Sequence, residues 1–157
     1  MKLRHVQALC AVIAIAALAV AGALHAVETH EHPVGGKLAL NAGKKWATDE
    51  PLRRGMDTIR ADLAPRLAGI HKGKLSADEY RALGGDIEKQ VGTIVAECKL
   101  EPKADAMLHL IIADLAAGSD AMQGKGKVAA ADGARQAVHA VNAYGQYFDH
   151  PGWKPLR

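Results

Sequence analysis

The sequence predicts an all-α protein, folded as an up-down-up-down antiparallel four-helix bundle. Three observations lead to this fold class. Apolar residues recur every three or four positions in four successive segments, which is the spacing of amphipathic helices. No segment shows the alternation of apolar and polar residues that a half-buried strand requires. Only a few residues join the four segments, so neighbouring helices have to run antiparallel.

The first helix is predicted to begin near the run Thr48, Asp49, Glu50, Pro51. A capping side chain, an acidic residue and an early proline are all favoured at a helix start. Pro65 lies inside the apolar stripe and is expected to interrupt and kink the helix. The stripe consists of Leu52, Met56, Ile59, Leu63, Leu67 and Ile70.

The other three helices follow with similar signals. The second opens with a capping box formed by Ser76 and Glu79. The third is predicted to start near Pro102, and the fourth runs from about Lys127 to Phe148. Their apolar stripes are Tyr80, Leu83, Ile87, Val91, Ile94 and Cys98; Leu108, Ile111, Leu115 and Met122; and Ala131, Ala134, Val138, Val141 and Gly145.

The N-terminal residues 1–26 are predicted to be a signal peptide. Two basic residues precede the apolar run 6–24, and the small residues 21–23 form a cleavage motif, with a cut after residue 26 as the alternative. The apolar run approaches spanning length, so an uncleaved membrane anchor is the competing interpretation. We expect the mature protein in a bacterial periplasm, without a membrane partner after cleavage.

After the signal, we expect a mobile His-containing tether over residues 27–46 and the bundle over 47–157. The tether has Gly, Pro, His and Glu but no sustained apolar period. The net charge of +3 falls to +1 without the two basic signal residues, which excludes a nucleic-acid footprint. Cys98 is the sole cysteine of the mature chain, so it is buried, metal-bound or paired between chains.

The up-down order assigns the chemistry-bearing residues to two ends of the bundle. One end, which we call the lysine end, has few acidic neighbours; a solvated turn region and a docking patch for an acidic protein partner around Lys72 and Lys125 both fit it. The other, the aromatic end, is where we expect any ligand. The lysine end gathers His71, Lys72, Lys74, Lys125 and Lys127. The aromatic end gathers Trp46, Met56, Cys98, Met107, His109, Tyr144, Tyr147, Phe148, His150 and Trp153.

Two stretches resemble the soluble periplasmic four-helix b-type cytochromes. The segment 126–146 is similar to the last helix of that family, and Gly55-Met56 is similar to its methionine-bearing turn. The stretches 40–49, 98–100 and 148–153 resemble a group of small exported proteobacterial proteins labelled DnrO, a likeness that implies no mechanism.

The cytochrome resemblance implies a haem held between a methionine of the first helix and a histidine of the last. Met56 matches the methionine, but Gly145, next to Tyr144, stands where the histidine belongs. His109 is the best substitute ligand. We therefore expect the two helix ends to lie side by side with a hole at Gly145, and a colourless protein. Covalent c-type attachment is excluded because no Cys-x-x-Cys-His motif is present.

A metal site without haem is the further option at the aromatic end. Cys98, Met56, Met107 and His109 carry the thiol, thioether and imidazole groups that suit copper. An axial offset of about 10 Å between Cys98 and His109 argues against joint ligation by these two residues. His30 and His32 of the tether offer a second, looser site for copper or zinc.

The sequence thus favours a non-enzymatic periplasmic bundle that binds a metal ion or small ligand. No nucleophile, base and orienting group can be assembled, and Asp105 with His109 is an ordinary surface pair. The alternatives are a b-type haem electron carrier that uses Met56 and a substitute histidine, and a haem-free interaction module. Copper or zinc ranks before haem b as the cofactor.

Overall fold

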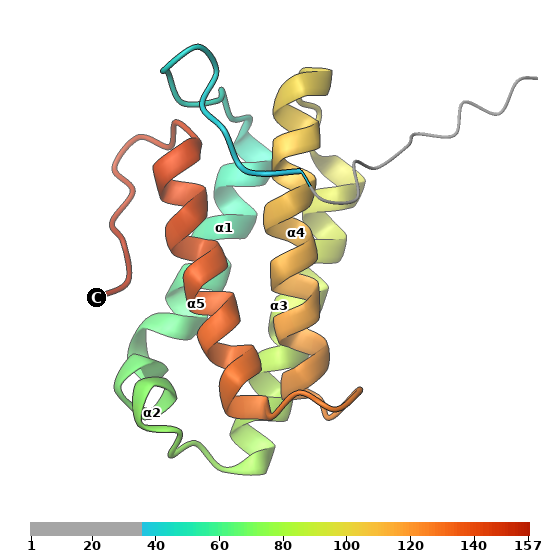
Figure 1. Cartoon of the computed structure of the whole chain (residues 1–157), viewed down its shortest axis with the longest axis vertical. Helices are drawn as coiled ribbons and strands as arrows, with labels where there is room; N and C mark the ends of the chain where they lie inside the picture. Colours follow the sequence, from blue (N-terminus) through green and yellow to red (C-terminus); the bar gives the residue numbers. More distant parts are fainter. Residues whose placement is uncertain (1–35) are drawn as a thin grey trace, which may run out of the picture. The chain divides into compact units, whose positions relative to one another are not determined.

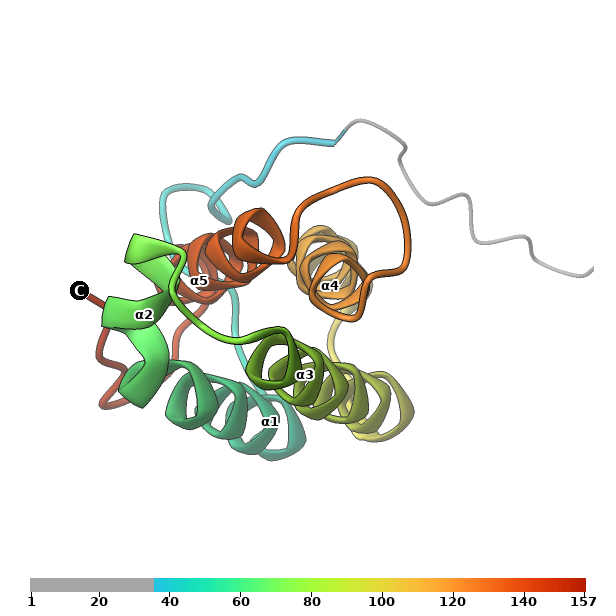
Figure 2. The same ribbon diagram turned by 90° about the horizontal axis from the view of Figure 1, so that it is seen from below.

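A computed structural model describes residues 36–157, so the predicted signal peptide and tether residues 27–35 lie outside the described residues. The described part of the chain is helical and has no strand beyond two isolated bridges, which confirms the all-α fold class. The helices run alternately up and down, and the end-on view places α1, α3, α4 and α5 at four corners (Figures 1 and 2). The elements are α1 (Glu50–Leu63), the 3-10 turn η1 (Ala64–Arg66), α2 (Leu67–Lys72), α3 (Ala77–Glu97), α4 (Pro102–Met122) and α5 (Ala130–Tyr147).

Side-chain caps start the first two predicted helices where the sequence places them. The carboxylate of Asp49 accepts a hydrogen bond of 3.0 Å from the Leu52 amide at the start of α1. Ser76 and Glu79 form the predicted capping box, in which each side chain accepts from the backbone amide of the other. α4 begins with Pro102. The first amides of a helix have no acceptor within the helix, so the missing N–H of proline costs no hydrogen bond there.

The interruption predicted at Pro65 is present. α1 ends two residues before it, η1 spans it, and the chain continues as the short helix α2. Proline has no N–H to donate within a helix and its ring crowds the preceding turn, which accounts for the break. α2 is capped at its C-terminal end by Gly73, whose φ of 61° lies in the left-handed region. The amide of Lys74 then bonds the Gly69 carbonyl at 2.9 Å and closes the helix end.

The predicted apolar stripes meet along the axis of the bundle and form its core. The fully buried side chains come from every one of the four long helices, so each stripe faces inward. They include Leu52, Met56, Ile59, Leu63, Leu83, Ile87, Ile94, Leu108, Ile111, Leu115, Val141 and Tyr144. Within residues 36–157, no helix combines the length and the hydropathy needed to cross a membrane.

Near the lysine end, glycines bring three helices into backbone contact, an arrangement we call the glycine crossing. A Cβ built on Gly118 of α4 would lie 2.6 Å from the carbonyl oxygen of Gly133 on α5. A Cβ on Gly84 of α3 would lie 2.9 Å from the carbonyl oxygen of Ser119. Ser119 in turn donates from its hydroxyl to the Gly84 carbonyl at 2.8 Å. The helices can approach this closely only because these positions have no side chain.

Residues 36–46, which we call the arm, cross the aromatic end of the bundle (Figure 1). Trp46 at the end of the arm is only 9% exposed and packs in the core. Its amide donates to the Tyr147 carbonyl and its carbonyl accepts from the Asp149 amide, both at 2.8 Å. The predicted boundary of the tether at residue 46 is therefore corrected, because the large apolar indole belongs to the packed bundle.

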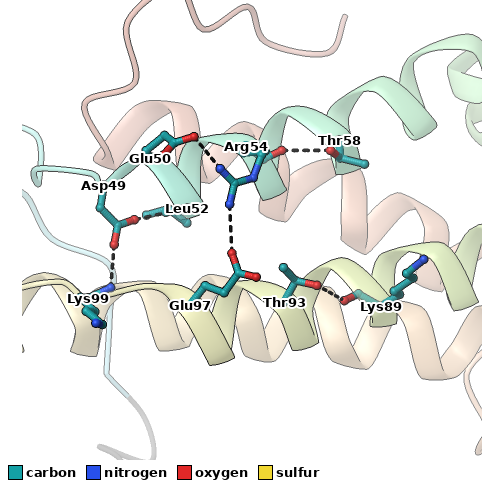
Figure 3. Close-up of polar contacts among 9 residues, drawn as sticks. All are labelled: Asp49, Glu50, Leu52, Arg54, Thr58, Lys89, Thr93, Glu97 and Lys99. Carbon is teal, nitrogen blue, oxygen red and sulfur yellow. Dashed lines mark hydrogen bonds and ion pairs between the residues drawn. The ribbon is translucent and has the colours of Figure 1, made fainter.

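A polar clamp ties the start of α1 to the end of α3 (Figure 3). Besides capping α1, the Asp49 carboxylate accepts a 2.6 Å hydrogen bond from the Lys99 amide. Arg54 bridges Glu50 on its own helix and Glu97 on α3, at 2.5 and 3.0 Å. This clamp holds α1 against the end of α3, where Cys98 is located.

Candidate functional site

A small cleft at the aromatic end brings Cys98 and His109 together. Cys98 is the C-terminal cap of α3, and His109 lies two turns into α4. The cleft has a volume of about 190 Å³. Its remaining wall is mainly apolar and consists of Ile94, Val95, Asp105, Leu108 and Ile112.

The sequence-based argument from axial offset, which counts against joint ligation by Cys98 and His109, stays a prediction although both residues line this cleft. The offset was counted between backbone positions along the helices. A helical side chain leans towards the N-terminus of its helix. For α4 the N-terminus is the aromatic end, so the imidazole of His109 leans back towards Cys98. Side-chain direction shortens the gap that the backbone rise predicts.

Asp105 orients the imidazole of His109. The Nδ1 atom lies 2.9 Å from the Asp105 carbonyl oxygen and 3.4 Å from its carboxylate. Because both neighbours are acceptors, Nδ1 carries the hydrogen in the neutral ring, and Nε2 carries the lone pair. Histidines that bind metals are commonly held this way by a backbone or carboxylate oxygen. The predicted i, i+4 pairing of Asp105 and His109 is present and sets the tautomer.

Cys98 is a protonated thiol rather than a reactive thiolate. Burial, followed by the negative charge of Asp49 and a side-chain hydrogen bond with it, raises the pKa of Cys98 to about 12. A thiol with such a pKa is a poor nucleophile at neutral pH. A metal ion that binds here has to displace the thiol proton. The pKa thus argues against nucleophilic catalysis at Cys98.

The wider metal shell considered from the sequence does not assemble. Met56 is fully buried in the core, and Met107 is partly buried and packs against the core. Neither methionine lines the cleft. Among residues 36–157, no three histidine, cysteine or acidic side chains converge on a common metal position. The predicted tether ligands His30 and His32 lie outside the described residues.

The predicted hole at Gly145 is wrong, because the indole of Trp153 fills it. A Cβ on Gly145 would lie 2.1 Å from Nε1 of Trp153 and 2.3 Å from its Cδ1. An imidazole therefore has no room at this position. Met56 of α1 is buried in the core, and Trp153 covers Gly145 of α5, the position expected to face Met56 across the haem. The residues present therefore do not fit a haem iron between α1 and α5.

An aromatic cluster closes this end of the bundle. The ring of Tyr144 stacks on Phe148 at 5.3 Å and meets the edge of Trp153 at 4.9 Å. His150 packs against both Tyr144 and Trp153, at 5.8 and 4.9 Å between ring centroids. Burial raises the pKa of Tyr144 far above its ordinary value, so its hydroxyl stays protonated. Tyr144, predicted to touch a cofactor, is instead covered by the chain's own rings.

Sequence reasoning did not predict the path of the segment that carries His150 and Trp153. Residues 149–157, which we call the tail, turn back after α5 at Gly152 and run along the side of α5 (Figure 1). The side-chain amide of Asn142 accepts a hydrogen bond of 2.8 Å from the Leu156 amide and donates one of 3.1 Å to the Leu156 carbonyl. From α1, Arg60 donates to the Lys154 carbonyl. The tail thus lies in the seam between α1 and α5.

Two larger surface hollows border the tail and share His150. One, of about 640 Å³, lies along α1 and includes Arg53 and Arg54. The other, of about 480 Å³, lies between the tail and α5. Both arginines are already bonded, Arg53 to the carbonyl and hydroxyl oxygens of Thr48 and Arg54 to its two glutamates. These bonds hold both guanidinium groups against the protein itself.

The lysine end has more acidic neighbours than the sequence indicated. Lys125 lies 3.2 Å from a carboxylate oxygen of Glu88 and 3.2 Å from one of Asp120. The bundle places Glu88 of α3 beside the loop after α4, a proximity that sequence distance conceals. Lys125 is therefore paired within the protein, and the acidic partner at Lys72 and Lys125 stays a prediction.

No family model matches this chain, and no curated protein or solved structure is significantly similar to it. The resemblance to four-helix b-type cytochromes and to DnrO proteins stays a prediction.

Proposed function

We propose that this protein is an exported, non-enzymatic helical bundle that binds a soft metal ion, Cu(I), in the cleft between α3 and α4. The observation that carries the proposal is the shared cleft of Cys98 and His109. A thiol and an imidazole are a donor pair that suits copper. The orientation of His109 by Asp105 supports the same role.

The size of the cleft favours an ion over an organic ligand. Pockets for organic ligands commonly measure about 300–1,000 Å³, whereas this cleft measures about 190 Å³. Two protein donors also leave a zinc ion short of the four ligands of a structural site. Cu(I) is the ion selected by soft sulfur ligands. Binding should release the Cys98 proton and weaken as the pH falls.

Cu(I) titration of the mature protein against a chromophoric chelator tests the proposal. We expect one bound ion per chain, and Cys98→Ser and His109→Gln should each weaken binding by roughly 100-fold or more, beyond the usual loss for residues that only support a ligand. His71→Gln at the lysine end is the matched control and should leave the affinity unchanged.

A variant that begins at Gly36 separates the cleft from the tether. Retained binding in this variant, with loss in Cys98→Ser, supports the cleft. Binding that disappears with residues 27–35, or that persists in both Cys98→Ser and His109→Gln, overturns it. The same preparations should have no Soret band, because Trp153 occupies the space that an axial imidazole needs.

A further inference from the structure

We propose that the tail is an acid-released strap, held over the seam between α1 and α5 by His150 and freed from it when that imidazole is protonated. The inference is independent of metal binding in the cleft, because His150 is not among the residues that line the cleft. It rests on the hydrogen bonds, ring contacts and burial of His150.

His150 lies between a buried hydroxyl and an exposed carboxylate. Its Nδ1 is 3.0 Å from the hydroxyl of Tyr144, and its Nε2 is 3.4 Å from the carboxylate of Asp57. The side chain of His150 is 6% exposed, whereas that of Asp57 is 62% exposed. The ring therefore sits inside the aromatic cluster, while its counter-charge is screened by water.

The neutral imidazole suits both of its polar neighbours. Nε2 carries the hydrogen, because the Asp57 carboxylate can only accept. Nδ1 then accepts from the Tyr144 hydroxyl. Protonation of the ring turns Nδ1 into a donor, so the Tyr144 hydroxyl has to accept from it and its own hydrogen loses this acceptor. A buried group that loses its hydrogen-bond partner destabilises the docked state.

The charges around His150 act in opposite directions. Burial lowers the pKa of His150, Asp57 raises it and Arg53 lowers it, with a net decrease from the ordinary value. Protonation is therefore easier when the tail is undocked, and docking weakens as the pH falls below about 6.5. The charged and titratable groups that border the ring are Glu50, Arg53, Arg54 and Asp57 of α1, Tyr144 of α5 and Lys45 of the arm.

The other anchors of the tail follow its first turn, which His150 holds. Trp153 covers Gly145, and Leu156 is 7% exposed. Both follow His150 in the chain, and Gly152, with a φ of 80°, is the turn at which release of the imidazole begins to loosen them. α1 and α5 contact each other far less than the other neighbouring pairs of long helices do. Undocking thus exposes apolar surface along the seam without unfolding the four helices.

Amide hydrogen exchange at Leu156 in the full mature chain tests the proposal. This amide is bonded to Asn142, so it reports docking of the tail. Protection, corrected for the intrinsic exchange rate, should fall between pH 7.5 and 5.0, by roughly tenfold for each unit that docking lowers the pKa of His150. Core amides of α3 should keep their protection.

The variant His150→Gln should lose this pH step, and His139→Gln, on an exposed part of α5, should keep it. If His150→Gln does not dock at either pH, the imidazole titration of His150 decides by NMR against a peptide of residues 147–157. A pKa in the protein equal to or above that of the peptide overturns the proposal. So does equal protection of Leu156 at both pH values, or a pH step that persists in His150→Gln.

Discussion

The two ends of the bundle are closed in opposite ways. At the glycine crossing, α4 and α5 touch through the backbones of Gly118 and Gly133, and side chains are missing where the helices meet. At the aromatic end, the space between the helices is filled by large rings, several of which come from outside the helices. Trp46 comes from the arm and Trp153 from the tail.

This difference shows where the molecule can change without losing its fold. A backbone contact has no rotamers to rearrange, so an added atom at the glycine crossing has to push whole helices apart. A contact made by the arm or tail can be relieved by moving that segment alone. The proposed metal cleft and the acid-released tail both belong to the aromatic end, the part of the bundle closed by such segments.

The substitution Gly118→Ala should produce the largest effect and tests the rigid side of the comparison. The new Cβ would lie 2.6 Å from the Gly133 carbonyl oxygen and 3.2 Å from the Ala137 amide nitrogen. We expect unfolding in urea to show a loss of about 3 kcal/mol, the upper range for overpacking. Gly85→Ala is the control, because nothing lies within 4 Å of its Cβ. That variant should gain about 0.5–1 kcal/mol from helix propensity, and equal effects at both glycines would refute the rigid crossing.

The substitution Gly145→Ala tests the adaptable side. Its Cβ would meet the Trp153 indole rather than a helix backbone, so the tail can move away. We expect a loss of about 1–2 kcal/mol, with increased exchange at Leu156 and unchanged core amides. In a double-mutant cycle, Trp153→Ala should remove most of the penalty of Gly145→Ala. Additive losses would show that Trp153 is not the group displaced.

The substitution Asp49→Asn should cost about 1 kcal/mol at pH 7, because asparagine keeps the helix cap but its amide nitrogen cannot accept the second hydrogen bond, from the Lys99 amide. Burial alone would raise the pKa of Asp49, but hydrogen bonds from the amides of Lys99 and Leu52 outweigh it and hold the pKa below its ordinary value. The charged carboxylate therefore stabilises the fold above about pH 4, and this contribution is lost as the pH falls through the folded-state pKa. Urea midpoints of the two proteins should converge in acid; a difference independent of pH would contradict the mechanism.

The smallest effect is expected at Ala42 in the arm. Its φ of 49° places a non-glycine residue in the left-handed region, beside Gly43 at 83°. Asparagine tolerates this conformation better than alanine does. Ala42→Asn should therefore raise the free energy of unfolding by about 0.5 kcal/mol. Thermal melts would detect the gain, and a loss would mean that the arm does not keep this turn in solution.

Local signals in the sequence predicted the helices well. The cap at Asp49, the capping box at Ser76 and the break at Pro65 each depend on residues within one helical turn. Cys98 and His109 were identified as candidates from their side-chain chemistry, but the cleft that both line was not predicted. Trp153 was placed at the correct end of the bundle, yet its position over Gly145 had no signal in the periodicity, because the tail has no regular period.

The sequence by itself determined the fold class, the inward faces of the helices and the set of residues gathered at each end. These properties follow from helical spacing, capping and short connections, which act over a few residues. Only the tertiary structure decided that Cys98 and His109 share a cleft, that Trp153 fills the place beside Gly145, and that His150 lies between Tyr144 and Asp57. Each of these contacts joins segments distant in the chain, and its geometry depends on side-chain direction and on where irregular segments return.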